Sequence, residues 1–448
     1  MGENKKTLIY ICAAAVLALL AFIMAPKKIT PDAFIEQGEI FFPDFTDPNE
    51  ATTLEVISFD QNSGQAVPFK VTFENGLWTI PSHYNYLADG KERLAKTATG
   101  LIGIKKDDFR TDNISEHEQL GVVDPMDATA SLTGRGQKIT IKASEKILAE
   151  MIIGNQVAGR KNVRFVRLPD QKRVYSARID IDISTKFEDW IETDLLNVMK
   201  HKINKVVLKD YSINEKTFSV DNRDVLNLTM KDELWSANKM GSGKVVDSAK
   251  MNALLSTLDE LKIVGVRPKP EGLSASLKLT DQQQNLNRSE IRSLQNKGFY
   301  VSRDGQLLSN EGEVQFNTSD GVKYTLRFGE VVYGSGLAVS AGGDKSRDEG
   351  DGQNRYLFIT SEFISNYFKE PAKPKNRAFE NKADSLLTET DQKNKELDRK
   401  HKDWQRQVEN GRKLSNDLNE RFADWYYVIS SDSFDELHLK RKDLVISK

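Results

Sequence analysis

Phe69-Lys-Val-Thr-Phe-Glu-Asn-Gly-Leu-Trp78 and Leu226-Asn-Leu-Thr-Met-Lys-Asp-Glu-Leu-Trp235 are two stretches built on one plan. Each begins with the alternation of a strand, turns over a few polar residues and resumes a strand on a tryptophan. This pattern predicts a β-hairpin in each stretch, with Trp78 and Trp235 at equivalent places. The chain therefore contains an internal repeat, which sets the fold.

A helical pattern follows each tryptophan. It runs from Asp89 to Ile104 in the first repeat and from Asp247 to Ile263 in the second, with apolar residues at three- and four-residue steps. Each pattern opens on an aspartate that can cap a helix. One apolar stripe per helix predicts that each helix lies on a sheet.

Further strands close on a glycine in both repeats. Residues 149–154 and 324–329 end on Gly154 and Gly329, and a second strand follows each of them, at 164–168 and 355–359. These pairs predict hairpins. Near the end of each repeat, Phe187-Glu-Asp-Trp190 resembles Phe422-Ala-Asp-Trp425, which suggests a further pair of equivalent tryptophans.

The second repeat contains an insertion over residues 370–420. It opens with Pro371 and Pro374 and is otherwise dense in charged and amide side chains, while a sparse apolar stripe falls near one helical face. Polar residues interrupt the stripe, so it predicts a long helix and not a stable two-stranded coiled coil. This helix either covers its own domain or docks on a partner protein.

The N-terminus carries an apolar run without a charge from Thr7 to Ala25. As a helix it approaches the roughly 30 Å hydrocarbon core of a bilayer, and the edge Ala25-Pro26-Lys27-Lys28 is a poor cleavage site. These features predict an uncleaved single-pass anchor in the inner (cytoplasmic) membrane. Residues 1–6 form a cytoplasmic tail, membrane lipid surrounds the helix, and the bulk of the chain is expected on the extracytoplasmic side.

Composition limits the function classes. Hydrophobic residues make up 38% and charged residues 29% of 448 positions, typical of a folded protein with room for two or three domains. With 64 basic against 66 acidic residues, no overall field attracts nucleic acid. The single cysteine, Cys12, cannot form an internal disulfide.

No motif of covalent or metal chemistry stands out. The five histidines lack metal-ligand spacing, no serine occupies a nucleophile elbow, and Gly241-Ser-Gly-Lys244 lacks the first glycine and the hydroxyl of a phosphate loop and is expected to form a turn. We therefore predict no catalytic, cofactor-binding or metal-binding residues and no enzyme activity. A hydrolase site built from dispersed acids is a minor alternative.

The expected fold class is α+β, with an N-terminal transmembrane helix, two related sheet-plus-helix repeat units and a long C-terminal helical segment. The expected parts are the tail, 1–6; the anchor, 7–25; a linker, 26–50; the first repeat unit, 51–200; the second repeat unit, 201–369; the inserted helical segment, 370–420; and a C-terminal segment that completes the second unit, 421–448.

Several motifs resemble a bacterial family, the domain of unknown function (DUF) 4340. They are the hairpin at 226–235, Arg267-Pro-Lys-Pro270, Leu294-Gln-Asn-Lys-Gly-Phe299, Gly312-Glu-Val-Gln-Phe316 and the strand at 321–329. The resemblance implies one N-terminal membrane helix and genes beside those of gliding-motility-type ABC transporters. Its motifs are structural, so no catalytic residue carries over, and the 370–420 insertion is a departure from it.

Two functions are compatible with these observations. The first is a non-enzymatic, membrane-anchored accessory subunit of an ABC-type export or envelope complex, whose partners are the transporter permease and auxiliary subunits. The alternative is an extracytoplasmic envelope-binding module for peptidoglycan, polysaccharide or an exported polypeptide, which requires exposed aromatic residues.

Overall fold

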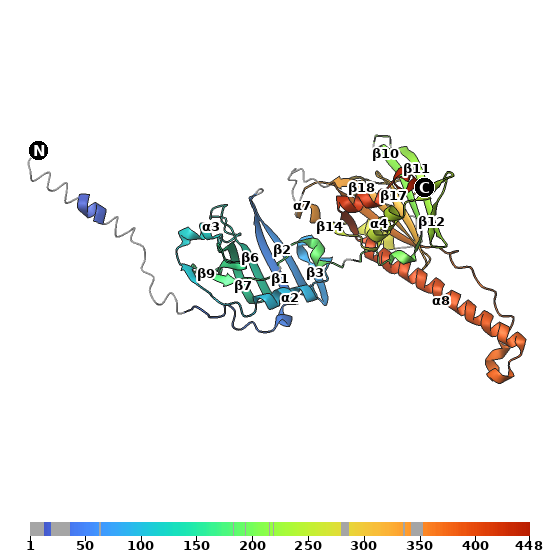
Figure 1. Cartoon of the computed structure of the whole chain (residues 1–448), viewed down its shortest axis with the longest axis horizontal. Helices are drawn as coiled ribbons and strands as arrows, with labels where there is room; N and C mark the ends of the chain where they lie inside the picture. Colours follow the sequence, from blue (N-terminus) through green and yellow to red (C-terminus); the bar gives the residue numbers. More distant parts are fainter. Residues whose placement is uncertain are drawn as a thin grey trace, which may run out of the picture. The chain divides into compact units, whose positions relative to one another are not determined.

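The computed structural model describes residues 13–18, 36–61, 64–181, 183–192, 194–214, 216–217, 219–278, 286–334, 337–341 and 353–448. Contacts within the chain group it into two units (Figure 1). Unit 1 comprises residues 1–51, 57–66 and 95–182, and unit 2 comprises residues 52–56, 67–94 and 183–448. The repeat boundaries expected near residues 200 and 369 stay a prediction.

Unit 1 is built on an antiparallel meander of four strands, with a fifth strand at its edge. Its regular elements are η2 (Pro48–Glu50), β5 (Phe109–Thr111), η4 (Ile114–Glu116), α3 (His117–Leu120), β6 (Gln137–Ala143), β7 (Lys146–Gln156), β8 (Val163–Arg167) and β9 (Val174–Arg178). Strands β6, β7, β8 and β9 pair in sequence, and β5 pairs with β9. Leu120, Val122, Ile152 and Val174 form one core cluster.

Three elements run through both units: β1 (Thr53–Asp60), β2 (Gln65–Glu74) and α2 (Lys91–Leu101). In unit 2, β2 pairs with β3 (Leu77–Ile80), and β3 pairs with β4 (Tyr86–Leu87).

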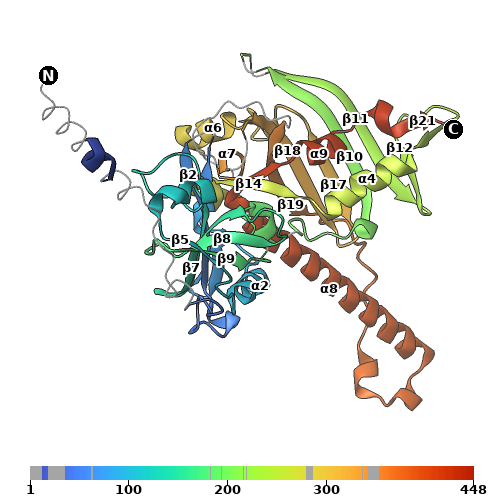
Figure 2. The same ribbon diagram turned by 60° about the vertical axis from the view of Figure 1, so that its left-hand side comes forward.

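Unit 2 also holds an eight-stranded sheet in the order β12-β11-β10-β17-β18-β19-β20-β14 (Figure 2). Its strands are β10 (Ile203–Asn214), β11 (Ser219–Lys231), β12 (Leu234–Ala237), β14 (Ile263–Pro268), β17 (Glu313–Thr318), β18 (Val322–Val332), β19 (Asn354–Phe363) and β20 (Trp425–Ile429). Two small sheets pair β13 (Lys244–Val246) with β21 (Val445–Ser447) and β15 (Phe299–Val301) with β16 (Leu307–Ser309).

The helices of unit 2 are α4 (Ser248–Asp259), α5 (Glu271–Lys278), α6 (Arg288–Gln295), α7 (Leu337–Ser340), α8 (Glu389–Ala423), α9 (Ser431–Leu437) and α10 (Arg441–Leu444). Short 3-10 turns are η3 (Pro81–His83), η5 (Phe187–Trp190), η6 (Lys200–Lys202), η7 (Ala378–Asn381) and η8 (Asp384–Leu386). Under α5 and α6, a core cluster joins both helices to the sheet through Leu273, Leu294, Phe299, Phe358 and Tyr426.

The two repeats share one strand plan. Hairpin β2–β3 corresponds to β11–β12, with Phe73 opposite Trp78 and Met230 opposite Trp235. The meander β6 to β9 with β5 on its far edge corresponds to β17 to β20 with β14. The predicted hairpins are therefore confirmed, including the equivalence of Trp78 and Trp235.

The equivalence expected between Trp190 and Trp425 is wrong. Trp190 ends η5, after β9, whereas Trp425 opens β20, the strand that corresponds to β9. Similar short sequences therefore fill different places in the two repeats.

Of the two predicted helix caps, only one is present. The Asp247 carboxylate accepts from the Ala249 and Lys250 backbone N–H groups at the start of α4, as an N-cap aspartate does. In the first repeat α2 begins at Lys91, after Gly90. A Cβ at Gly90 would lie 2.9 Å from Val71 and 3.2 Å from Trp78, so the chain passes close to the hairpin there.

The expected transmembrane helix is corrected. Within the part of the chain that the structure describes, no helix is both long and apolar enough to cross a membrane. Of the anchor predicted over residues 7–25, only residues 13–18 are described, and they are helical; the others lie outside the described residues. The fold class with a transmembrane element and the single-pass inner-membrane location are corrected with it. The contact with membrane lipid stays a prediction.

The inserted segment is helical over only part of its predicted length. Helix α8 begins at Glu389, and residues 370–388 contain only the short turns η7 and η8. Pro371 and Pro374 account only for the start of this segment, because each lacks a backbone N–H and disfavours a helical residue before it. The structure begins α8 at the Thr388 capping box instead. The helix then continues to Ala423, three residues beyond the predicted end.

Gly154 and Gly329 occupy the same structural place, and for one reason. In unit 1, a Cβ at Gly154 would approach the Leu120 carbonyl; in unit 2, a Cβ at Gly329 would overlap the Lys297 carbonyl and lie 2.8 Å from Phe299. In each case the connection that precedes the meander crosses directly over the strand, and only glycine leaves room for its backbone.

We predict that Gly329→Ala destabilises the chain by about 1–3 kcal/mol, the usual cost of forcing a methyl group into a packed site. Gly241→Ala is the control, since its added Cβ meets only Lys244 at 4.0 Å. Urea unfolding of the two variants checks this. Equal midpoints would show that the crossing connection gives way at no cost.

Candidate functional site

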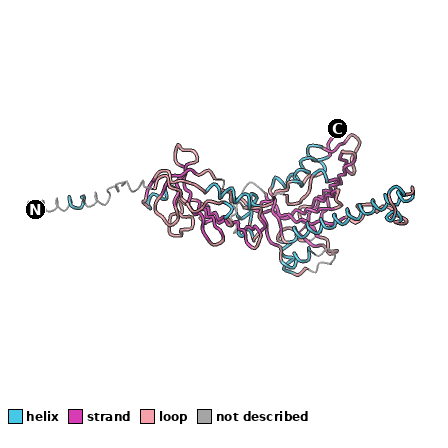
Figure 3. Tube along the Cα trace, turned by 90° about the horizontal axis from the view of Figure 1, so that it is seen from below, coloured by secondary structure: helices cyan, strands magenta, loops and turns pink. Residues whose placement is uncertain are grey.

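The most distinctive feature of unit 2 is a helical arm, defined here as residues 364–424. It connects β19 to β20, which are hydrogen-bonded neighbours in the sheet. The corresponding connection in the first repeat, between β8 and β9, is only residues 168–173. Helix α8 has 35 residues and is therefore about 52 Å long. Figures 1 and 3 show that it extends well beyond the sheet that it leaves.

An outgoing segment, residues 364–388, runs along α8. The Trp404 indole N–H donates to the Phe368 carbonyl at 3.1 Å. Nearer the tip, the Lys375 backbone N–H donates to the Asn394 side chain at 3.2 Å. These contacts lie between Asn394 and Trp404, so the outgoing segment supports the N-terminal half of α8. The arm is a two-layer element and not a bare helix.

The tip of the arm is closed by a capping box. The Thr388 hydroxyl accepts from the Asp391 backbone N–H, and the Asp391 carboxylate accepts from the Thr388 backbone N–H. Lys382 reaches back to the same carboxylate at 2.6 Å, although only 6% of the Asp391 side chain is exposed. The hydrogen bonds from Lys382 and Thr388 lower the pKa of Asp391 to about 2.

The stem of the arm lies on the sheet. The Ser361 hydroxyl of β19 donates to the Ser415 carbonyl at 2.9 Å, and the Asn419 amide bonds both the Ser361 N–H and its carbonyl, at 2.9 and 2.8 Å. At Gly411 a Cβ would lie 2.6 Å from the Asp320 carbonyl. Glycine inside a helix costs about 1 kcal/mol, and here it allows the helix to approach the β17–β18 turn closely.

Lys269 clamps the end of α8. Its ammonium group donates to the Phe422 carbonyl at 2.8 Å, and its backbone N–H donates to the Asp424 carbonyl at 2.8 Å. The carbonyls of the last helical turn have no partner within the helix, so a lysine there satisfies one of them and complements the helix dipole. Burial lowers the pKa of Lys269 well below its ordinary value. The ammonium also lies 3.9 Å from the centre of the Phe358 ring.

Helix α5 adds a second contact at the same point. Ser274 bonds the Asp424 carboxylate, and Lys278 forms an ion pair with it at 2.8 Å. Lys269 lies between Pro268 and Pro270, in the Arg267–Pro270 motif that the sequence singles out only as a family resemblance. Its role as an anchor was missed by sequence reasoning, because the partner carbonyl at Phe422 is more than 150 residues away.

Two open hollows lie on the arm. One, of about 470 Å³, lies at the stem and contains Asp194, Lys202, Asp320 and Asp417 in its wall. The other, of about 880 Å³, lies towards the tip. Four basic side chains on one face of α8 line the tip hollow at steps of four, three and four residues, and we call them the basic stripe: Lys395, Arg399, Lys402 and Arg406.

The tip hollow is not purely basic. Glu396, Asp398 and Asp403 also line it, together with Phe379 and Leu387. Asp398 is already engaged, because Arg377 and Lys402 both contact its carboxylate at 2.7 Å. The hollow therefore presents guanidinium and ammonium groups beside two apolar side chains, a surface suited to an acidic segment of a partner protein.

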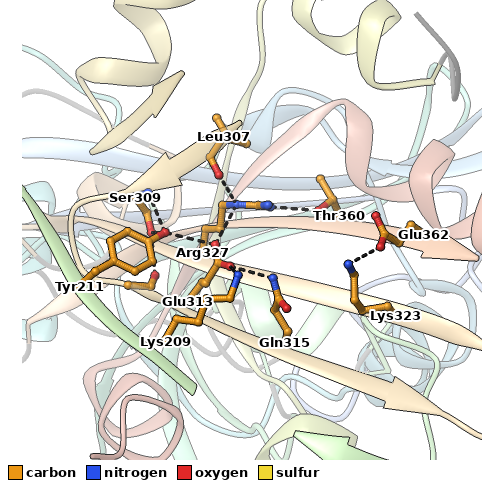
Figure 4. Close-up of polar contacts among 11 residues, drawn as sticks. Lys209, Tyr211, Leu307, Ser309, Glu313, Gln315, Lys323, Arg327, Thr360 and Glu362 are labelled. Carbon is orange, nitrogen blue, oxygen red and sulfur yellow. Dashed lines mark hydrogen bonds and ion pairs between the residues drawn. The ribbon is translucent and has the colours of Figure 1, made fainter. Parts of the chain in front are cut away.

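A buried polar cluster occupies one face of the eight-stranded sheet (Figure 4). Glu313 on β17 has only 4% of its side chain exposed. Its Oε1 accepts from Lys209 Nζ at 2.7 Å and Gln315 Nε2 at 2.8 Å, and its Oε2 accepts from Tyr211 Oη at 3.1 Å and Arg327 Nε at 3.3 Å. Each carboxylate oxygen thus has two donors.

The partners of Glu313 are also engaged. Arg327 donates to the Leu307 carbonyl at 2.8 Å and the Thr360 hydroxyl at 3.0 Å. Burial raises the pKa of Tyr211 to about 12. The hollow beside Glu313 and Lys209 measures about 10 Å³, about the space of one water. With its lone pairs occupied and no room for a substrate, this cluster is a structural bridge across strands β10, β17, β18 and β19.

His83 has a serine hydroxyl beside each of its two ring nitrogens. It is 1% exposed, with Nδ1 at 3.0 Å from the Ser82 hydroxyl and Nε2 at 2.8 Å from the Ser340 hydroxyl. Burial lowers its pKa to about 4, and its ring stacks on Phe187 with centroids 4.7 Å apart. A histidine beside a serine resembles a nucleophile and base, but so deeply buried a ring cannot reach a substrate.

The other histidines are dispersed, and each has a separate surrounding: His117 bonds the Lys172 carbonyl, His401 contacts Glu370, His438 stacks on Phe434, and His201 is exposed. Over the described residues, no three histidine, cysteine, aspartate or glutamate side chains lie close enough to hold a metal ion. Gly241–Lys244 forms the turn before β13, with Gly243 at a φ of 74°.

The tryptophans differ in burial. Trp190 is completely buried, whereas Trp78, Trp235, Trp404 and Trp425 are half-buried. Trp425 packs against Tyr86 with ring centroids 5.0 Å apart. An aromatic binding surface needs tryptophan side chains that are not fully buried. Four of the five tryptophans meet this condition, so the envelope-binding alternative stays open.

Comparison with family models gives one match. Residues 78–276 match the model described as Domain of unknown function (DUF4340). The match includes the hairpin at 226–235 and Arg267–Pro270, while the motifs between Leu294 and Gly329 and the helical arm lie outside it. Neither the curated proteins nor the solved structures provide a match.

We predict that Glu313→Ala destabilises the chain by about 3–5 kcal/mol, because removal of one partner leaves buried donors and charges unpaired. Glu362→Ala is the matched control: it breaks an ion pair with Lys323 on the same face, but Glu362 is 62% exposed, so the loss is below about 1 kcal/mol. Chemical unfolding measures both. Equal losses would contradict the structural role of Glu313.

We also predict that the arm tip loosens only in strong acid. The pKa of Asp391 is lowered by folding, so its contribution is complete above the ordinary value near 4 and is lost as the pH falls towards about 2. The backbone amide signal of Thr388 in NMR spectra should follow this titration. In Asp391→Asn the titration is absent, and a midpoint near 4 in the native chain would contradict the capping geometry.

Proposed function

Because the chain belongs to the DUF4340 family, we propose that it is a non-enzymatic accessory subunit of an ABC-type export or envelope complex of the gliding-motility-like kind. The helical arm is its partner-binding element, and the transporter permease or an auxiliary subunit is the partner. The family match itself names no function; the link to ABC transporters comes from the resemblance described above.

The observation that carries the proposal is the construction of the arm. A helix about 52 Å long is clamped at its base by Lys269, supported by the outgoing segment and capped at its tip. The contacts of the arm fix its direction, but most side chains between Gln392 and Asn410 remain exposed. Such a helix adds little to the core of its own unit, so its length is best explained by a contact beyond it.

The basic stripe is the part of the arm that best fits a partner. Its four cations share one helical face and line the tip hollow with Phe379 and Leu387. Opposite charge on a partner speeds association and selects the partner, while the two apolar side chains provide contact area. An acidic segment of a transporter subunit is the expected ligand.

One observation supports the second candidate, an envelope-binding module. Trp78 and Trp235 recur at equivalent hairpin positions and are both half-buried. Each exposes part of an aromatic ring that can pack on a sugar or a polypeptide. Neither side chain lines the two hollows on the arm, so this candidate ranks second.

An affinity pull-down from detergent-treated lysates of the native host tests the proposal, with bound proteins identified by mass spectrometry. Full-length chain should retain an ABC permease, ATPase or auxiliary subunit. Arg399→Glu, in the basic stripe, should lower its recovery at least about tenfold, as expected for reversal of one charge in a charged interface.

The matched control is Lys393→Glu, the same charge change on another face of α8, which should leave recovery unchanged. Recovery of the chain alone would contradict the proposal. Recovery only of wall material would favour the second candidate. Loss of the transporter with both variants would show that overall charge, and not the basic stripe, governs binding.

A further inference from the structure

The hairpins β2–β3 and β11–β12 have the same turn type and the same residues after the turn. Asn75 and Gly76 form the first turn and Asp232 and Glu233 the second, all with positive φ, as a two-residue hairpin turn of the primed type requires. In both hairpins the next two residues are Leu-Trp. The leucines are exposed, Leu77 by 56% and Leu234 by 73%.

The outer edges of the two hairpins differ. In the first repeat β4 pairs with β3, with Leu87 opposite Thr79 and Tyr86 opposite Ile80. The backbone N–H of Ala88 donates to the Trp78 carbonyl at 2.9 Å. The strand that follows the first hairpin therefore covers its outer edge.

In the second repeat, β13, the strand that follows the hairpin, does not pair with the hairpin. Strand β13 pairs with β21 at the C-terminus, with Val245 opposite Ile446, and β12 ends the order of the eight-stranded sheet. Over the residues that the structure describes, no backbone N–H donates to the Trp235 carbonyl, the equivalent of the Trp78 carbonyl. One strand position that the first repeat pairs with its own chain is thus not hydrogen-bonded in the second within the described chain, although β13 passes close to β12.

The register shows which groups face this edge. The Asn238 backbone N–H donates inward to the Asn227 carbonyl at 2.9 Å, and inward and outward residues alternate along an antiparallel strand. The backbones of Ala237 and Trp235 therefore face outward. Natural edge strands are usually protected by a charge or a proline. Leu234-Trp-Ser-Ala237 carries neither.

We propose that the outer edge of β12 binds a short extended segment of a partner polypeptide, which completes the sheet in the second repeat as β4 does in the first. The chain itself supplies the chemistry of the occupant: β4 is an aromatic–aliphatic pair, Tyr86-Leu87, in extended conformation. Ala237 stands where the first repeat has the larger Ile80, which leaves room for an apolar side chain opposite it. Backbone hydrogen bonds hold such a strand, and the exposed Leu234 adds an apolar contact.

This surface is independent of the helical arm, so it goes beyond the proposed function. The probe is a fluorescent peptide with the sequence of residues 82–90, Ser-His-Tyr-Asn-Tyr-Leu-Ala-Asp-Gly, titrated with the full chain and followed by anisotropy. Saturable binding with a Kd of about 10–100 μM is expected, the range of weak segment recognition. No saturation up to about 1 mM would overturn the proposal.

Two matched pairs locate the binding. A peptide with proline in place of Ala88 lacks the N–H that would reach the Trp235 carbonyl, and it should bind at least about tenfold more weakly. Leu234→Asp in the protein should have a similar effect, whereas Leu386→Asp, an exposed leucine at 70% on the arm, should have none. These variants change exposed side chains, so folding is not at risk.

Equal binding of both peptides, or of both leucine variants, would overturn the proposal. Dimerisation of the full chain that Leu234→Asp abolishes would also overturn it, since the edge would then belong to a second copy. Arg399→Glu should bind the peptide normally, which separates a failure here from a failure of the arm as a partner site.

Discussion

The hydrogen-bonded pairing of β19 with β20 is the constraint on which the rest of unit 2 depends. The chain leaves the sheet after Phe363 and must return to the neighbouring strand at Trp425. An insertion between adjacent strands therefore has to begin and end at nearly one place. An outgoing segment and a returning helix meet this requirement, and the Lys269 clamp on the last carbonyls of α8 fixes the point of return.

Buried charge in this protein serves construction. Lys269 is surrounded by aromatic rings and bonded to helix carbonyls, and Glu313 receives four donors. Groups so fully engaged hold elements together, since a buried charge without partners would cost several kcal/mol. The charges of the basic stripe lie on the exposed arm instead, where Lys402 and Arg406 form ion pairs with Asp398 and Asp403 beside the tip hollow. Buried charges thus hold the fold together, and exposed charges on the arm face solvent.

The two repeats keep their strand plan and differ in their connections. Between β8 and β9 the first repeat has a short loop, where the second has the arm. At the hairpin edge the difference is reversed, because β4 pairs with β3, whereas no strand of the described chain pairs with the outer edge of β12. Gly154 and Gly329, by contrast, are kept because a backbone crosses each of them.

The sequence alone determined the hairpins at Trp78 and Trp235, the meander strands and the Asp247 cap, because alternation, turn residues and caps act between neighbours in the chain. Only tertiary structure decided that Trp190 and Trp425 are not equivalent, that Lys269 holds α8 and that Glu313 is saturated. Each depends on groups distant in sequence. The apolar run at 7–25 is a further case: its composition predicted a spanning helix, whereas no helix in the described part of the chain is long and apolar enough to cross a membrane.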